Sequence, residues 1–437
     1  MMLRSFAACT LAGAAAVAAI PTISVKGSKF FTSEGNQFYV KGIAYQLVPD
    51  DPLIDATQCG LDAALMKTIG TNSIRVYHVD PAEDHTKCMS AFADAGIYIW
   101  LDLDTFDTQI EQIAPKWNES QRDAFAAVMD EFQQYDNLAG FFVGNEVLTT
   151  GNGSVAAPYV KAAARDMKAH REAKKYRNIP IGYSAADIAT LRPMLQNYLA
   201  CGSNASEALD FFSLNAYSWC GNSDYKTSGY EMLEANSTSY SIPIFLSETG
   251  CQTVRPRTFQ DQTAIFGDMA ETWSGSIIYE WIEEANNYGL ISYGSKVDPA
   301  SPSAPPDGFP RSGTPIPIQP DFSNLSNVWK TLSPTGVKES AYKPTNSAPE
   351  CPDQTSGVWE VNPTSALPTL GQVYNAQAAT GTASASGSGT ARPSGTASGS
   401  AGQASASSTG AATDGLSREL TGAGAALVAV MAVFAWL

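Results

Sequence analysis

Two glutamates occupy positions where a charged side chain needs an explanation. Glu146 ends the apolar run 139–146 and Glu248 ends the apolar run 242–248, and neither run carries another charge. Desolvating a carboxylate is costly unless it is paired or hydrogen-bonded, so such positions are usually held for a function. A carboxyl that protonates a leaving oxygen and a carboxylate that attacks the anomeric carbon are the pair that a glycosidase needs.

An alternation of strands and helices predicts how these two residues are positioned. Eight apolar or β-branched runs predict strands at 38–45, 73–79, 97–103, 139–146, 179–184, 211–217, 242–248 and 275–281. Helical patterns lie between them, at 59–69, 81–95, 120–135, 155–177, 190–200, 228–240 and 258–273. Near-continuous apolar strands are typical of a parallel sheet that is buried on both faces. The pattern therefore predicts an α/β fold, a (β/α)8 TIM barrel.

The barrel predicts where the chemistry takes place, because catalytic groups of such folds lie at the carboxyl ends of the strands. The fourth and seventh predicted strands end in Glu146 and Glu248, so the two carboxylates should face each other across the barrel mouth. The apolar approach to Glu146 predicts a desolvated carboxyl with a raised pKa, as a proton donor requires. Asn145 is then placed to hold a sugar 2-hydroxyl.

Other strand ends carry side chains that suit a neutral polysaccharide. They are Tyr77, Asp102, Tyr217, Trp219, Tyr279 and Trp281. Aromatic rings offer flat apolar faces to sugar C–H groups, and their polar atoms can bond hydroxyls, although packing at the rim explains any single ring equally well. After the last strand, Glu280, Glu283 and Glu284 lie close together; a solvated helix face explains them equally well, and no catalytic role is assigned to them.

Composition excludes several classes of partner. The net charge of −16 disfavours nucleic acids and anionic lipid headgroups. Six cysteines remain once Cys9 is removed with a signal peptide, an even number that predicts three disulfides in an oxidising compartment. No CxxC pair occurs and histidines are few, so neither a metal site nor an organic cofactor is expected.

Both ends of the chain carry processing signals. Residues 1–19 predict a secretory signal peptide. Residues 413–437 predict a GPI-attachment propeptide, with Gly410 the preferred attachment residue among Ser408, Gly410 and Asp414; a short transmembrane helix is the alternative for the apolar end.

The remaining chain divides into three predicted regions. A catalytic domain spans 20–325, whose proline-rich part from 285 predicts a long irregular loop. A post-barrel segment at 326–370 is expected to pack on the barrel, and a Ser/Thr/Gly/Ala-rich stalk follows at 371–412. Sequons for N-glycosylation occur at Asn118, Asn152, Asn204, Asn236 and Asn324.

The residues at the predicted strand ends resemble those of a known family. The matching stretches are KGIAYQ (41–46), IRVY (74–77), GIYIWLDL (96–103), GNE (144–146), NAYSWCG (215–221), SETGC (247–251) and EEANNYGL (283–290). Together they resemble the fungal GPI-anchored β-1,3-glucanosyltransferases of glycoside hydrolase family 72. SETGC with EEANNYGL is the specific part of this signal, because GNE alone occurs in many retaining glycosidases.

The resemblance implies a role for each matching residue. Glu146 would be the general acid/base and Glu248 the nucleophile. The residues implied to line the sugar-binding cleft are Gln46, Tyr77, Asp102, Asn145, Tyr217, Tyr279 and Tyr288. The implied disulfides are Cys59–Cys88, Cys201–Cys351 and Cys220–Cys251, which leave no cysteines for the Cys-rich carbohydrate-binding module that some members carry.

The resemblance also implies an activity. A family member would cut an internal β-1,3 linkage, form a covalent glucanosyl-enzyme and pass the new reducing end to the non-reducing end of another β-1,3-glucan, with no cofactor. It would act as a monomer, GPI-anchored on the outer face of the plasma membrane or resident in the cell wall. Two alternatives stay open: a hydrolytic endo-β-1,3-glucanase of the same fold, and a non-catalytic wall-binding mannoprotein.

Overall fold

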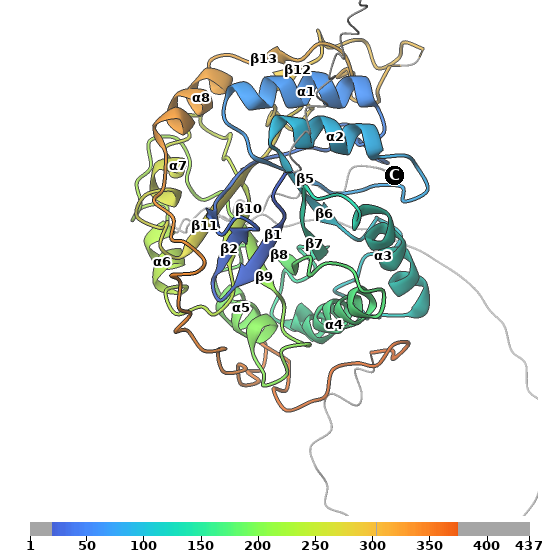
Figure 1. The fold of residues 1–437 in the computed structure, drawn as a ribbon, viewed down its shortest axis with the longest axis vertical. Coiled ribbons are helices and arrows are strands. Elements are labelled where there is room, and N and C mark those ends of the chain that lie inside the picture. The colour runs from blue at the N-terminus through green and yellow to red at the C-terminus, as the bar shows by residue number, and fades with distance from the viewer. Residues whose placement is uncertain (1–19, 303, 375–437) are drawn as a thin grey trace, which may run out of the picture. The chain divides into compact units, whose positions relative to one another are not determined.

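The computed structural model describes residues 20–302 and 304–374, and its centre is a closed barrel of eight parallel strands (Figure 1). The barrel strands are β4 (Val40–Ala44), β5 (Ser73–Val76), β6 (Tyr98–Asp102), β7 (Leu138–Asn145), β8 (Ile181–Ala186), β9 (Phe211–Asn215), β10 (Ile244–Thr249) and β11 (Trp273–Ile278). Pairing of β11 with β4 closes the ring. Each strand overlaps a predicted one, so the TIM barrel is confirmed.

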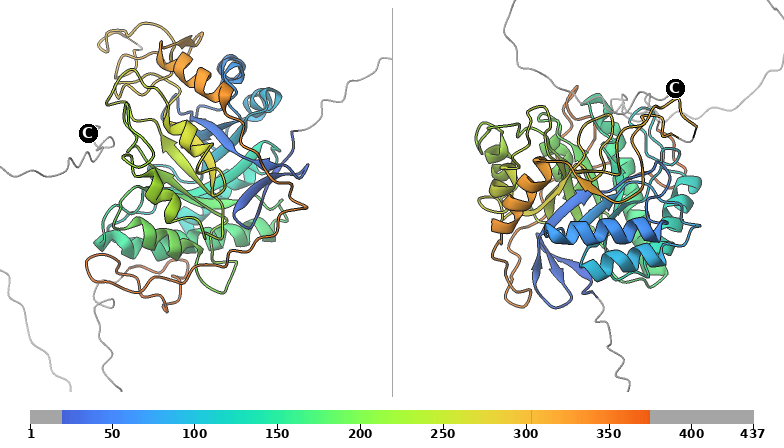
Figure 2. Two further views of the ribbon diagram at one scale, coloured as in Figure 1. Left: turned by 90° about the vertical axis from the view of Figure 1, so that its left-hand side faces the viewer. Right: turned by 90° about the horizontal axis from the view of Figure 1, so that it is seen from above.

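Helices alternate with the strands and surround the barrel, as Figure 2 shows from the side and from above. They are α1 (Ala56–Thr68), α2 (Thr86–Ala95), α3 (Glu119–Phe132), α4 (Ala157–Ala173), α5 (Arg192–Ala200), α6 (Tyr230–Ala235) and α7 (Asp261–Ile265), with the 3₁₀ turn η1 (Asn152–Ala156) before α4. Two helices, α6 and α7, are less than half as long as predicted. Helix α6 stops before the turn-forming residues 236–239 (NSTS), and α7 stops just before Gly267, a residue of low helix propensity.

The chain after the barrel differs from its prediction. Helix α8 (Asp321–Thr331) begins inside the expected irregular loop and crosses the expected domain boundary at residue 325. Its buried residues Phe322, Leu325 and Trp329 recur at helical spacing, so a packed apolar stripe forms despite the prolines before it. The short strands β12 (Ile291–Ser292) and β13 (Ile316–Pro317) pair within the loop itself.

A small sheet that the sequence analysis missed packs against one end of the barrel. It consists of β1 (Ile23–Lys26), β2 (Lys29–Thr32) and β3 (Gln37–Phe38). Phe30 of this sheet is fully buried, and its ring centroid lies 5.2 Å from that of Trp100 inside the barrel. Trp100 in turn lies 4.9 Å from Phe245, so aromatic packing fills this end of the lumen.

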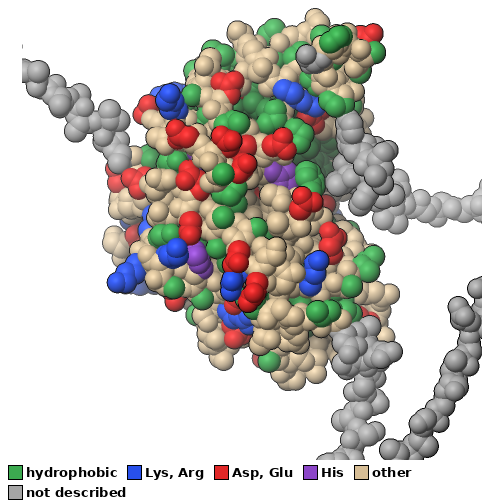
Figure 3. Space-filling view, turned by 90° about the vertical axis from the view of Figure 1, so that its right-hand side faces the viewer, with side chains coloured by type: hydrophobic (Ala, Val, Ile, Leu, Met, Phe, Trp, Pro, Cys, Tyr) green, Lys and Arg blue, Asp and Glu red, His purple; other side chains and the backbone are tan. Residues whose placement is uncertain are grey.

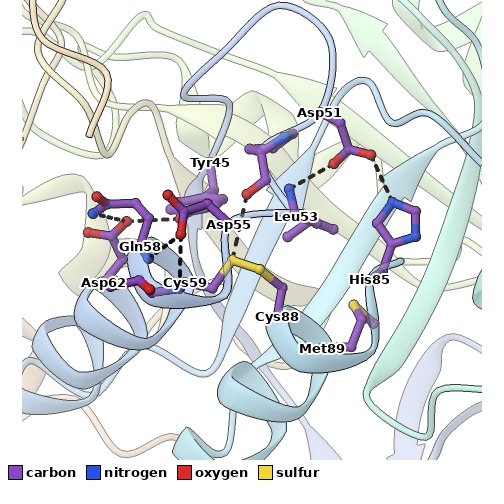
Figure 4. Close-up of a disulfide and its surroundings, with 12 residues drawn as sticks. Tyr45, Asp51, Leu53, Asp55, Gln58, Cys59, Asp62, His85, Cys88 and Met89 are labelled. Atoms are coloured by element: carbon purple, nitrogen blue, oxygen red, sulfur yellow. Dashed lines mark hydrogen bonds and ion pairs between the residues drawn. A yellow bond between two sulfur atoms is a disulfide. The ribbon is translucent and has the colours of Figure 1, made fainter. Parts of the chain in front are cut away.

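Three disulfides tie the outer elements together: Cys59–Cys88, Cys201–Cys351 and Cys220–Cys251. These are the pairs that the resemblance implied. Figure 4 shows the first pair, which joins α1 to α2. Within the described ranges, no helix is long and apolar enough to cross a membrane.

Residues 332–374, called here the C-terminal wrap, run along the outside of the barrel (the orange trace in Figure 1). Tyr342 contacts Ser28 of the small sheet, with 3.0 Å between their hydroxyl oxygens. The backbone N–H of Gly371 donates to the carbonyl of Trp117, just before α3. The first residues of the expected stalk, 371–374, therefore pack on the barrel, whereas the expected signal peptide, the rest of the stalk, Gly410 and the GPI propeptide lie outside the described residues.

Charge is dispersed over the surface that Figure 3 shows. Acidic side chains are interspersed there with basic and apolar ones, and basic residues form no large patch on that face. The whole chain has 43 acidic and 27 basic residues, and this face offers no basic surface that would bind a polyanion.

Candidate active site

The two glutamates meet at the carboxyl end of the barrel strands. Glu146 directly follows β7, and Glu248 lies in β10. Asn215, the last residue of β9, connects them: its Nδ2 donates to Glu146 Oε1 over 2.9 Å, and it is the register partner of Glu248. The fold therefore places both carboxylates at one mouth, as the strand order predicted.

Glu146 leaves its strand in an unusual backbone conformation. Its φ is +50°, in the left-handed region that non-glycine residues rarely occupy, at a cost of about 1–2 kcal/mol. Its side chain is exposed, so the desolvated environment that the apolar run suggested is wrong for this residue. The turn at Glu146 carries the side chain out of the apolar layer that the preceding strand residues form.

Glu248 is the desolvated member of the pair, with 8 % of its surface exposed. Three donors reach its carboxylate: Tyr217 over 2.7 Å, Tyr77 over 2.9 Å and Arg75 over 3.3 Å. The net pKa of Glu248 is raised to about 7: burial and the charge of Glu146 raise it, whereas Arg75 and the two phenols lower it. The donors thus favour the ionised form that a nucleophile needs.

Arg75 lies beneath Glu248 and is completely buried. Its guanidinium binds Asp102 through two hydrogen bonds, of 2.7 and 3.0 Å, and lies 4.3 Å from the ring centroid of Tyr77. Burial raises the pKa of Asp102, and the charge of Arg75 opposes that rise. Asp102 is only 2 % exposed, so the expectation that it lines the cleft is wrong. Its carboxylate holds Arg75 instead.

Gln46 and Asn145 have different surroundings. Gln46 Oε1 accepts from the backbone N–H groups of Tyr77 (2.9 Å) and His78 (3.2 Å), while its Nε2 donates to the carbonyl of Val48. Gln46 therefore orients the loop that carries Tyr77 through bonds that occupy both ends of its amide. Asn145 Oδ1 accepts from Asn215, so the polar atom left to Asn145 is its Nδ2 donor.

Tyr217, Tyr279 and Tyr288 form a cluster beside Glu248, called here the aromatic wall. Their ring centroids lie 5.2–6.4 Å apart, and each pair is in an edge-to-face arrangement. Burial raises the pKa of all three phenols, which keeps them neutral hydrogen-bond donors. The wall gives the mouth apolar ring surface and hydroxyl groups next to Glu248.

Arg75 and Asn215 are the functional residues that sequence reasoning missed. Ser184 and Ser247 both donate to Asn215 Oδ1, over 2.9 and 2.8 Å, which turns its Nδ2 toward Glu146. A signal was present for Arg75, because an arginine within the apolar run 73–79 requires a buried partner. Both residues also lie inside the family-like stretches IRVY and NAYSWCG.

The five predicted N-glycosylation sequons differ in how accessible their asparagines are. Asn152, Asn204 and Asn236 are exposed and Asn118 is half-buried, whereas the amide of Asn324 donates to the carbonyl of Arg257. In the described part of the chain, no group of three or more His, Cys, Asp or Glu side chains is placed to hold a metal ion.

A parallel barrel with one glutamate after its fourth strand and a second in its seventh defines a glycosidase-type enzyme site. Comparison with known proteins gives the family. Residues 12–301 match the model of glycoside hydrolase family 72, described as glucanosyltransferase. The chain belongs to this family.

Relatives and solved structures agree with this assignment. The chain is 41 % identical over 366 residues to Protein EPD1 of Candida maltosa, covering 82 % of this chain and 63 %, just under two thirds, of that protein. It is 40 % identical to the 1,3-beta-glucanosyltransferase GAS5 of Saccharomyces cerevisiae, covering 81 % and 71 %. A mutant of Saccharomyces cerevisiae Gas2p in complex with laminaritetraose and laminaripentaose superposes with a TM-score of 0.71 at 37 % identity, covering 81 % and 75 %.

Proposed function

We propose that the protein is a retaining β-1,3-glucanosyltransferase. The observation that carries the proposal is the pair of glutamates at one barrel mouth, with Glu248 bound by three donors. The activity named for the relatives, and the laminari-oligosaccharides bound by Gas2p, support β-1,3-glucan as donor and acceptor.

The first half of the reaction breaks a glucan chain. The Glu248 carboxylate attacks the anomeric carbon of an internal β-1,3 linkage while Glu146 gives its proton to the departing glycosidic oxygen. The reducing-end fragment leaves, and the rest of the donor stays bound to Glu248 as an ester. Asn215 fixes Glu146 for this step, and the Asn145 amide is placed to bond the 2-hydroxyl of the reacting sugar.

The second half builds a longer chain. Glu146, now ionised, takes the proton of the 3-hydroxyl at the non-reducing end of an acceptor glucan, whose oxygen attacks the anomeric carbon and releases Glu248. Two inversions restore the β configuration. Transfer exceeds hydrolysis only if the acceptor is held well enough to outcompete water at roughly 55 M, a matter of proximity and orientation. The aromatic wall supplies sugar-binding surface at this place.

Product length tests the proposal. Purified protein incubated with a reduced laminari-oligosaccharide and a laminari-oligosaccharide donor should give products longer than either substrate, as measured by chromatography and mass spectrometry. The variant Glu248→Gln should give none, which controls for a contaminating enzyme. If every product were shorter than the substrates, the protein would be an endo-β-1,3-glucanase. If no product formed at all, the non-catalytic wall-binding mannoprotein would be the remaining alternative.

The proposal includes a location. Residues 1–19 and 413–437 match the patterns of a signal peptide and a GPI signal, which supports a place on the outer face of the plasma membrane or in the adjoining wall.

A further inference from the structure

Glu280 is a buried carboxyl at the catalytic mouth to which the reaction assigns no role. It follows Tyr279 of the aromatic wall and is 3 % exposed. The explanation of a solvated helix face is wrong for this residue, because residues 279–290 form no helix. A side chain so thoroughly desolvated needs its own partners.

The partner of Glu280 is Asn286, and Asn286 holds Tyr288. Asn286 Nδ2 donates to Glu280 Oε1 over 2.7 Å. The Oδ1 of the same amide accepts the backbone N–H of Tyr288 over 3.1 Å. In addition, the backbone N–H of Glu280 donates to the carbonyl of Tyr288 over 3.2 Å. Tyr288 is thus attached to Glu280 through both of its backbone polar groups, once directly and once through Asn286.

Residues 279–290 are folded tightly, so the position of Glu280 can determine that of Tyr288. A side chain on Gly289 would place its Cβ 2.2 Å from the Cα of Glu283, so the chain crosses itself at a point that only glycine permits. The ring of Tyr288 lies 5.7 Å from that of Tyr217, whose hydroxyl donates to Glu248. A continuous series of contacts therefore runs from Glu280 to the nucleophile.

We infer that Glu280 is a positioning residue that, through Asn286, holds Tyr288 in the aromatic wall and so sets how tightly a glucan ring is bound beside Glu248. The inference rests on the proposed function for its substrate class. In this inference Glu280 does not contact the reacting atoms and takes no part in the chemical step.

The charges around Glu280 decide which substitution should preserve its role. Burial raises the pKa of Glu280 well above its usual value, and the nearby carboxylates of Glu284 and Glu248 raise it further, against the lowering effects of Asn286 and Arg311. Arg311 itself is engaged with Glu284 over 3.0 Å. Burial thus favours the neutral acid, and glutamine reproduces the charge of that form, its size and the oxygen that Asn286 needs.

Variants at both ends of this contact test the inference. We expect Glu280→Ala and Asn286→Ala each to weaken laminari-oligosaccharide binding about 5- to 20-fold, the range expected when a buried hydrogen bond is removed. Binding is measured by calorimetry in a Glu146→Gln background, and KM for transfer in the otherwise native enzyme. Glu280→Gln should stay within about twofold of the parent, and the Glu280→Ala/Asn286→Ala pair should be no worse than either single variant.

A control and two readouts keep the failures distinguishable. Glu284→Gln removes a nearby charge at a side chain that pairs with Arg311 and is not a hydrogen-bond partner of Asn286, so this variant should bind as the parent does. Three results would each overturn the inference: normal binding by both alanine variants, additive effects in the double variant, or failure of Glu280→Gln to preserve binding. Melting temperatures identify a variant that fails to fold. If Glu280→Ala fails to fold, the binding measured for Asn286→Ala decides the question. If no variant, including the parent, transfers glucan while the binding pattern holds, the proposed function fails and the positioning role of Glu280 stands.

Discussion

Glu248 shows how burial and hydrogen bonding act in opposite directions on one carboxylate. Burial favours the protonated acid, which cannot attack an anomeric carbon, and is the largest cause of a net pKa of about 7. Tyr77, Tyr217 and Arg75 all donate to the ionised form. Because the ionised form of the proposed nucleophile depends on these three donors, removing any one of them should be visible in the pH dependence of catalysis.

Replacing Tyr217 by phenylalanine should move the acid limb of the rate profile. The substitution deletes a donor 2.7 Å from Glu248, so the pKa of Glu248 rises. Since only the ionised carboxylate attacks, activity is present above this pKa and is lost as the pH falls through it. The acid limb of kcat/KM for transfer should therefore shift to higher pH, with a rate loss of about tenfold or more at the optimum.

A matched control for this profile is Tyr176→Phe. The Tyr176 hydroxyl also donates to a carboxylate, that of Asp130, over 2.8 Å, but away from the active site. Its profile should coincide with that of the parent enzyme. An acid limb that stays in place in Tyr217→Phe would show that Glu248 does not govern it.

At the scale of elements, His85 joins three parts of the barrel's outer layer. Its Nε2 lies 2.8 Å from Asp51 in the loop after β4, and its Nδ1 lies 3.1 Å from Glu131 on α3, while His85 itself precedes α2 (Figure 4 shows the Asp51 contact). Burial lowers the pKa of His85, but the hydrogen bonds and charges of Asp51 and Glu131 outweigh it, so the pKa is raised. The cluster stabilises the fold more when the ring is an imidazolium, because both ring nitrogens then carry a proton to donate to the two carboxylates.

This cluster predicts a pH dependence of stability. The folded pKa of His85 exceeds the unfolded value of about 6.5, so its contribution is fully present below that pH and is lost as the pH rises through the folded pKa. The free energy of unfolding of the native protein, measured by denaturant titration, should therefore decrease as the pH rises above about 6.5, and decrease more than that of His85→Gln. An equal pH dependence in the two proteins would exclude a charged His85 in the folded state.

At the scale of the whole molecule, the C-terminal wrap encircles part of the barrel through spaced contacts. Cys351 binds Cys201 at the end of α5, across a sequence separation of 150 residues. Farther along, Trp359 is fully buried, and its ring centroid lies 5.4 Å from that of Tyr198. These contacts lie along α5, whereas Glu146 and Glu248 lie at the strand ends.

Removing the Cys201–Cys351 disulfide should loosen the C-terminal wrap without abolishing transfer activity. We expect Cys201→Ser/Cys351→Ser to lower the free energy of unfolding by about 2–5 kcal/mol and to expose residues 332–374 to limited proteolysis. The comparison pair Cys59→Ser/Cys88→Ser opens a separation of only 29 residues, and chain entropy makes its effect smaller by about 1.5 kcal/mol. Transfer activity of the folded fraction should persist, and a wrap that resists protease in the first pair would contradict its dependence on the bridge.

The sequence by itself determined the barrel and the place of its two glutamates. Apolar runs alternating with helical patterns specify a parallel sheet, because strands buried on both faces tolerate few polar residues. A charge that ends such a run is then conspicuous, as Glu146 and Glu248 are. Local periodicity was sufficient for these features because each depends on residues that are near neighbours in the chain.

Only the tertiary structure decided which polar groups meet. The sequence places Asp102 at a strand end, but it does not show that Arg75, 27 residues away, donates hydrogen bonds to both of its carboxylate oxygens. Nor does it show that Glu146 is exposed while Glu248 is the desolvated carboxyl. The contact from Glu280 to Asn286 likewise requires a loop folded back on itself. The physical reason is common to all three: burial and hydrogen-bond partners are properties of three-dimensional packing, and the spacing of residues along a chain does not specify them.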